Sequence, residues 1–128
     1  MMKETSDYLK FLKEKGRPLN PSYSESLEIA LNIEECLTAI DILNRADVLI
    51  LGGEILTENN GQLIYAIHKW GYEYSYLNWS VDRKEVNESV KTYISESHRK
   101  ARECILAANE VADRLKNKCF VVLVTELG

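Results

Sequence analysis

Apolar residues recur at helical spacing in three parts of the chain. The first is residues 6–15, and Gly16 supplies the signal that ends a helix there. The second begins after Asn32, which forms a capping-box pattern with Glu35, and its apolar face recurs at steps of three and four through residue 43. The third covers residues 86–115, about 45 Å if continuous. Because a small domain is narrower than that, we expect a break near residues 95–97.

Strand patterns lie between these helices. Residues 27–31 alternate between apolar and polar positions, and residues 48–51 form an aliphatic run typical of a central strand. The Asn60-Gly61 pair predicts a tight hairpin, with residues 62–68 as the return strand, because both residues accept a positive φ. Residues 72–79 and 118–127 are predicted as two further strands, the last of them central.

These elements define a fold class. Consecutive strands joined by tight turns are antiparallel, and the helices lie toward both ends of the chain. We therefore predict an α+β domain with a mostly antiparallel sheet of four or five strands and helices packed on one face. The length of 128 residues fits one domain over residues 1–128, of which 1–24 form an N-terminal helix and loop extension.

Charge and apolar content narrow the possible partners. The formal net charge is -4, with no basic stripe, so a nucleic-acid partner is not expected and a basic protein partner is favoured. The first residues lack an apolar core of the signal-peptide type, and no run of 18 apolar residues occurs. We therefore expect a cytoplasmic protein with no membrane partner.

Residues that carry chemistry are few and scattered. Cys36, Cys104 and Cys119 lie far apart in apolar surroundings, which predicts buried thiols rather than a disulfide or metal site. Neither His68 nor His98 belongs to a recognisable motif, and no phosphate loop or nucleophile elbow is present. We expect no catalytic residues, no metal and no cofactor.

The Gly52-Gly53-Glu54 sequence follows the aliphatic run. Paired glycines within a strand indicate a bulge or a point of close packing. Glu54 then either faces solvent or anchors a hydrogen bond at the kink, because a buried carboxylate needs a partner.

An aromatic segment follows the hairpin. In an extended strand, one face would carry Trp70, Tyr72, Tyr74 and Tyr76, and the other Glu73, Ser75, Leu77 and Trp79. Rings of this kind either cover a sheet beneath a helix or form the anchors of a protein interface, and both interpretations stay open.

The order of these features resembles a known family. The residues that carry the resemblance are the helix ECLTAIDILNRA, the strand VLILGGEIL, the hairpin NGQLIYAI, the Asn78-Trp79 pair and the helical stretch SESHRKARECI, which together lie within residues 34–105. They are similar to bacterial polymorphic-toxin immunity proteins of the immunity protein 40 type. This chain has Glu54 where an aspartate is expected, and its stretch 66–76 is longer. The resemblance implies a small cytoplasmic α+β protein, encoded beside a toxin, that binds and neutralises it; it implies no particular binding residues.

The leading hypothesis is therefore an immunity protein that binds a cognate toxin domain and occludes it stoichiometrically. From residue type alone, the candidate partner-binding residues are Glu54, Glu58, Tyr72, Glu73, Tyr74, Tyr76 and Trp79. A homodimer through the tyrosine-rich segment is possible. The alternatives are a small cytosolic ligand-binding or regulatory protein-interaction module, and an enzyme that uses His68, His98, Glu54 or a cysteine in an unfamiliar arrangement.

Overall fold

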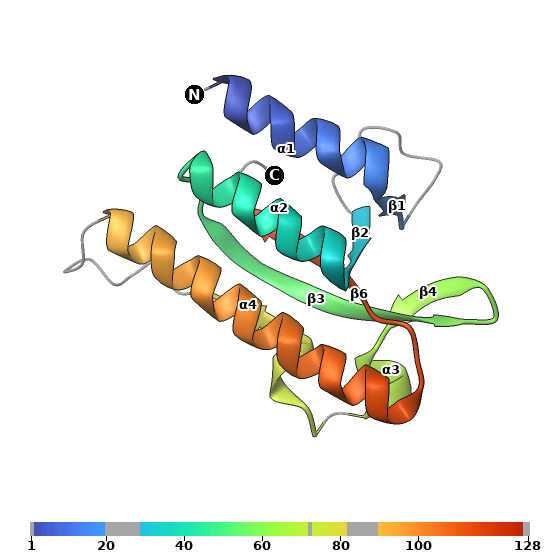
Figure 1. The fold of residues 1–128 in the computed structure, drawn as a ribbon. Helices are drawn as coiled ribbons and strands as arrows, with labels where there is room; N and C mark the ends of the chain where they lie inside the picture. Colours follow the sequence, from blue (N-terminus) through green and yellow to red (C-terminus); the bar gives the residue numbers. More distant parts are fainter. Residues whose placement is uncertain (1, 20–28, 72, 82–89, 127–128) are drawn as a thin grey trace.

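The computed structural model describes residues 2–19, 29–71, 73–81 and 90–126, and Figure 1 shows its fold. Of the segments predicted above, residues 1, 20–24, 27, 28, 72, 86–89, 127 and 128 lie outside the described part of the chain. The elements, in chain order, are α1 (Met2–Lys15), β1 (Arg17–Pro18), β2 (Ile29–Asn32), α2 (Ile33–Arg45), β3 (Ile50–Asn59), β4 (Gln62–Tyr65), α3 (Ile67–Trp70), the 3-10 helix η1 (Ser75–Leu77), β5 (Asn78–Ser80), α4 (Val90–Leu115) and β6 (Phe120–Thr125).

The described strands form one antiparallel sheet in the order β1-β2-β6-β3-β4, with β5 also paired to β3. The predicted α+β class is confirmed, and the sheet has six strands. The predicted last strand is central, since β6 lies between β2 and β3. Two strands pair with the edge of β3 that faces away from β6: β5 pairs with Gly52–Glu54, and β4 pairs with Leu56–Asn59.

The helices cover one face of the sheet. In Figure 1, α2 and α4 lie across the strands, and α1 lies beside α2. Helix α2 begins as predicted, because the Asn32 side chain accepts a hydrogen bond from the Glu35 amide at 2.8 Å and the Glu35 carboxylate accepts one from the Asn32 amide. Buried side chains of the helices and of the strands beneath them fill the main core; among them are Ile40, Leu43, Ile55, Leu77, Ala101, Ile105, Ala108, Ala112, Val121 and Leu123.

The opposite sheet face carries a second and smaller apolar cluster. Ala30, Leu56 and Val122 are buried there, with three half-buried residues packed against them, Leu19, Leu63 and Phe120. An antiparallel sheet can leave one face toward water, and side chains alternate between its faces along each strand. We call this surface the open face.

Helix α4 runs without interruption through the position where a break was expected. Its 26 residues span about 39 Å. The Ser97 hydroxyl, which interrupts the apolar stripe, donates to the Ile94 carbonyl at 2.7 Å and accepts from the Ile50 amide at 3.2 Å. Buried backbone groups need partners, and Ser97 supplies one to the irregular start of β3, so the predicted break is wrong.

The prediction for the aromatic segment is also wrong. The return strand β4 ends at Tyr65, the short helix α3 follows, and residues 72–79 do not form one extended strand. A turn and η1 precede β5, whose three residues pair with β3. The Asn60-Gly61 hairpin itself is confirmed, with φ values of 52° and 81°.

The paired glycines have the predicted role of close packing. The β3–β6 register shifts between Ile50 and Gly52, which marks a bulge. A Cβ atom on Gly53 would lie 2.3 Å from Cη2 of Trp79, so the indole ring of Trp79 occupies the space where a side chain would otherwise stand. Gly53 is thus required because the ring lies directly over its backbone.

Candidate partner-binding surface

Several of the residues selected from the sequence lie near one end of the molecule. This end, which we call the hairpin end, is formed by the β3–β4 turn (residues 60–61), α3, and the turn between α4 and β6 (residues 116–119) (Figure 1). Glu58 lies close to it on β3, and Tyr74 contacts the last turn of α4. Segments far apart in the sequence therefore contribute to a single surface.

Glu58 is the centre of a charged cluster. Arg17 Nη1 lies 2.6 Å from one of its carboxylate oxygens, and Lys118 Nζ lies 3.2 Å from the other. Lys69 Nζ donates to the Glu58 backbone carbonyl at 3.4 Å. The hydrogen bonds from Arg17 and Lys118 hold the pKa of Glu58 below its ordinary value. We call these four residues the Glu58 cluster; two of its cations pair with the carboxylate and the third contacts the backbone of the same residue.

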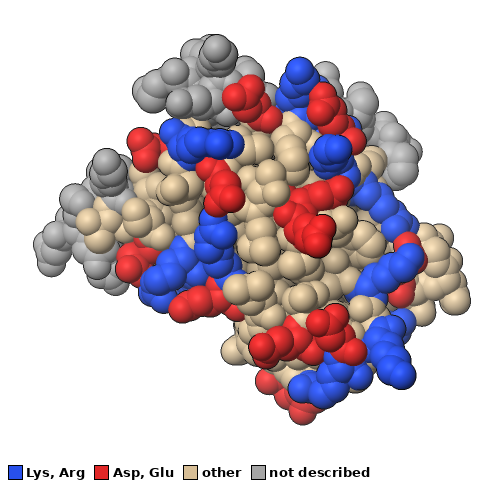
Figure 2. Space-filling view, in the orientation of Figure 1, with Lys and Arg blue, Asp and Glu red and all other residues tan. Residues whose placement is uncertain are grey.

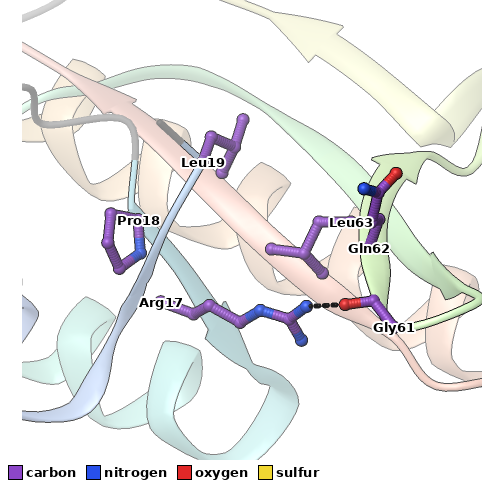
Figure 3. Close-up of a pocket in the computed structure, with 6 residues that line it drawn as sticks. All are labelled: Arg17, Pro18, Leu19, Gly61, Gln62 and Leu63. Atoms are coloured by element: carbon purple, nitrogen blue, oxygen red, sulfur yellow. Dashed lines mark hydrogen bonds between the residues drawn. The ribbon is translucent and has the colours of Figure 1, made fainter. Parts of the chain in front are cut away.

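Arg17 connects strands that are distant in the sheet. Its Nη2 donates to the Gly61 carbonyl at 2.6 Å, and its guanidinium carbon lies 5.8 Å from the centre of the Phe120 ring. The side chain thus crosses the open face from β1 to the hairpin turn, as Figure 3 shows. These contacts fix the guanidinium in place, because its two nitrogens and its flat face each have a partner.

A groove lies beside this side chain on the open face. It has a volume of about 390 Å³ and is lined by Arg17, Pro18, Leu19, Gly61, Gln62 and Leu63. Figure 3 shows that the β1 side supplies one wall and the hairpin supplies the other. Leu19 and Leu63 pack against the buried apolar cluster, so the groove combines an apolar floor with a polar rim.

Tyr74 and Tyr76 form a second feature near the hairpin end. Both are half-buried and packed against the main core, and their ring centres lie 5.9 Å apart. The Tyr74 hydroxyl accepts a hydrogen bond from Arg114 Nη2 at 3.1 Å. Glu73 beside them is exposed. Each ring therefore covers the core and keeps part of its surface exposed, and its role as a partner contact stays a prediction.

The other selected residues are placed differently. Trp79 is buried, with 6% of its surface exposed, and it covers Gly53 from the helix side of the sheet. Glu54 is half-buried on the opposite, open face, between its register partners Val122 and Asn78. Tyr72 lies outside the described residues. The structure does not test any of these residues as partner contacts, and they stay predictions.

Sequence reasoning missed Arg17, Lys118 and the groove. Arg17 and Glu58 are 41 positions apart, and nothing in their local pattern indicates that β1 and the hairpin approach each other across the sheet. The one available signal was the Asn60-Gly61 hairpin, which predicts a projecting turn and therefore a surface feature.

The reactive residue types have surroundings that suppress reactivity. Burial raises the pKa of Cys119 to about 12, and it also raises the pKa values of the Cys36 and Cys104 thiols. A nucleophilic thiol needs a shift in the opposite direction. His98 is also buried, and its Nε2 donates to the Val48 carbonyl at 2.6 Å. Among the described residues, no three His, Cys, Asp or Glu side chains gather as a metal site requires.

None of the described helices is long and apolar enough to cross a membrane. The fold and its surface define a small α+β domain with an open, grooved sheet face. The family model for Immunity protein 40 matches residues 18–125, which is most of the chain. The protein therefore belongs to the Immunity protein 40 family, as the resemblance implied, and the match is wider than residues 34–105. Searches of the curated proteins and of the solved structures found no match.

Proposed function

We propose that this protein is an immunity protein that binds a cognate bacterial toxin domain in the cytoplasm and neutralises it by stoichiometric occlusion. The observation that supports this proposal is the family match over residues 18–125, which covers the groove and the Glu58 cluster except for Arg17. Occlusion requires no chemistry by the immunity protein. It requires a rigid surface of about 800 Å² per partner with a few well-packed anchors.

The structure supports a rigid binding surface. Arg17 holds the hairpin turn to β1, and Trp70 Nε1 donates to the Asn117 side chain at 3.1 Å, which ties α3 to the turn between α4 and β6. A surface that is ordered before binding loses less conformational entropy when the complex forms. The hairpin end therefore suits tight association.

A co-expression rescue tests this proposal. The C-terminal domain of the protein encoded beside this gene is induced alone and together with this chain, and surviving colonies are counted. We expect killing by the neighbour alone and survival with this chain. As a control, Leu43→Asp places a charge in the core and should abolish rescue by unfolding the protein. A harmless neighbour, or equal killing in both cultures, would contradict the proposal.

A further inference from the structure

The Glu58 cluster has more positive than negative charges, although the chain as a whole is acidic. Arg17 and Lys118 pair with the Glu58 carboxylate and Lys69 contacts the Glu58 backbone carbonyl, so the cluster carries three positive charges and one negative charge, whereas the whole chain has a net charge of -4. In Figure 2, the side of the molecule beside the β3–β4 hairpin likewise shows more Lys and Arg than Asp and Glu. The hairpin end is thus a local cationic surface on an acidic protein.

The cations are exposed to solvent, but they differ in exposed fraction and in how many hydrogen-bond partners they already have. The Lys118 side chain is 70% exposed, the Arg17 side chain 39%, and the Glu58 side chain 22%. Arg17 already satisfies Glu58 and Gly61, so its role is to hold the groove open and in shape. Lys118 retains most of its surface for an incoming group, and its ammonium has three donors.

The groove adjoins this charge directly. Arg17 belongs both to the cluster and to the groove lining, in which the apolar side chains of Pro18, Leu19 and Leu63 alternate with polar groups of Arg17, Gly61 and Gln62. Its volume of about 390 Å³ is at the small end of the range for binding sites. That size suits a single side chain of a partner whose apolar part contacts Leu19 and Leu63, while the adjacent cations suit a carboxylate.

We propose, on the basis of the proposed function, that the groove and the Glu58 cluster together form the contact surface for the toxin. The toxin contributes an apolar side chain to the groove and a neighbouring Asp or Glu to Lys118 and Lys69. The three cations favour an acidic contact surface on the partner, in place of the basic partner that the net charge alone favours. A nucleic acid would require a continuous basic surface, and Glu58 interrupts this one. A net acidic chain thus presents a locally basic contact.

Two substitutions separate the charge from the groove. Lys118→Glu reverses the most exposed charge, while the Lys118 backbone carbonyl still accepts from Thr57 Oγ1 at 2.8 Å. Gln62→Trp places a large ring at the exposed rim of the groove. The matched control is Lys100→Glu, an exposed lysine on α4 whose ammonium contacts the Ser80 carbonyl and which changes the net charge equally.

The experiment measures the affinity of the purified toxin domain, encoded beside this gene, for the full-length chain and each variant by biolayer interferometry. Circular dichroism and the melting temperature confirm that each variant is folded. We expect Lys118→Glu to weaken binding by about tenfold or more and to flatten its salt dependence, because a close charge pair is lost. Gln62→Trp should weaken binding by a similar factor without changing the salt dependence, and Lys100→Glu should stay within about threefold.

The outcomes distinguish the two proposals. If the wild type binds tightly and the folded Lys118→Glu and Gln62→Trp variants bind equally well, this surface is wrong while the immunity function stands. If Lys100→Glu loses as much affinity as Lys118→Glu, the charge effect is general and the assignment to the hairpin end is wrong. If the folded wild type does not bind the toxin domain, both the function and the surface are overturned.

Discussion

At the scale of single residues, Gly53 and Trp79 depend on each other. The indole ring lies where a Cβ atom on Gly53 would stand, at 2.3 Å from Cη2. We predict that Gly53→Ala lowers the free energy of unfolding by about 1–3 kcal/mol, because it overpacks a buried contact. Urea denaturation measures the loss. In a Trp79→Phe background the same change should cost less, since the nearest ring atoms are removed; an equal cost in both backgrounds would contradict this account.

His98 makes stability depend on pH. Burial is the main cause that lowers its pKa below the ordinary value of 6.5, while its bond to the Val48 carbonyl acts in the opposite direction. Of the neighbouring charges, Arg102 lowers the pKa further and Asp47 raises it. The unfolded chain therefore binds more protons than the folded protein when the pH lies between the folded pKa and 6.5.

It follows that the free energy of unfolding decreases as the pH falls below about 6.5, by at most about 1.4 kcal/mol per pH unit from this residue. Chemical denaturation at about pH 7.5 and about pH 5.5 measures the change. His98→Gln keeps a donor toward Val48 but does not titrate, so its stability should decrease less over the same interval. Equal decreases in both proteins would show that His98 does not contribute.

The structural roles of single residues could be predicted from the sequence where they depend on residues nearby in the chain. The Asn32–Glu35 capping box and the Asn60-Gly61 turn depend on neighbours within a few positions, and both are confirmed. Arg17 could not be assigned a role, because its partners Glu58 and Gly61 are 41 and 44 positions away and meet it only in the folded sheet.

At the scale of elements, α4 shows how a tertiary contact accounts for a polar residue in an apolar stripe. Ser97 is buried and accepts a hydrogen bond from the Ile50 amide. We predict that Ser97→Ala lowers the free energy of unfolding by about 1–3 kcal/mol, because it leaves that buried amide unsatisfied. This loss should occur even though alanine is the better helix former.

Ser95→Ala is the matched control for this change. Ser95 is exposed on the same helix, so its replacement should alter the free energy of unfolding by no more than about 0.5 kcal/mol. Both variants are compared by urea denaturation. If Ser97→Ala is as stable as Ser95→Ala, the contact between α4 and the start of β3 does not stabilise the fold.

The aromatic segment was mispredicted for a reason at this scale. Its spacing of two is the pattern of a strand, but β4 already occupies part of the edge of β3. Only Asn78–Ser80 pair with β3, at Gly52–Glu54, and the residues before them form a turn and η1. The spacing of residues within the segment does not reveal that two segments pair with the same edge of β3. The helices and the central strands were predictable because their apolar residues recur at regular spacing.

Tyr74 and Tyr76 stay predicted partner contacts, and their packing determines how they must be tested. Because both rings are half-buried against the core, the double substitution Tyr74→Ala with Tyr76→Ala should lower stability by a few kcal/mol, about 2–4, as well as weaken toxin binding. Tyr74→Phe removes only the hydroxyl that accepts from Arg114. Binding by the folded double variant that equals the wild type would exclude these rings as anchors.

At the scale of the whole molecule, the protein is a two-layer domain whose helices stabilise one sheet face and whose open face carries the groove. The fold class could be predicted from the order of helices, strands and turns, and the family from the sequence motifs that carry the resemblance. The proposed contact surface could not be predicted, since the Glu58 cluster combines residues from β1, β3, α3 and the turn before β6. Only the folded chain brings those side chains together.

The central claim is that this protein neutralises a toxin by forming a complex with it. Isothermal titration calorimetry of the purified full-length chain with the toxin domain encoded beside its gene tests that claim most directly. We predict one immunity protein per toxin and a dissociation constant in the nanomolar range or below, about -12 kcal/mol or stronger. Rescue of growth with no measurable binding by the folded protein would contradict occlusion, and would show that protection arises without a stoichiometric complex.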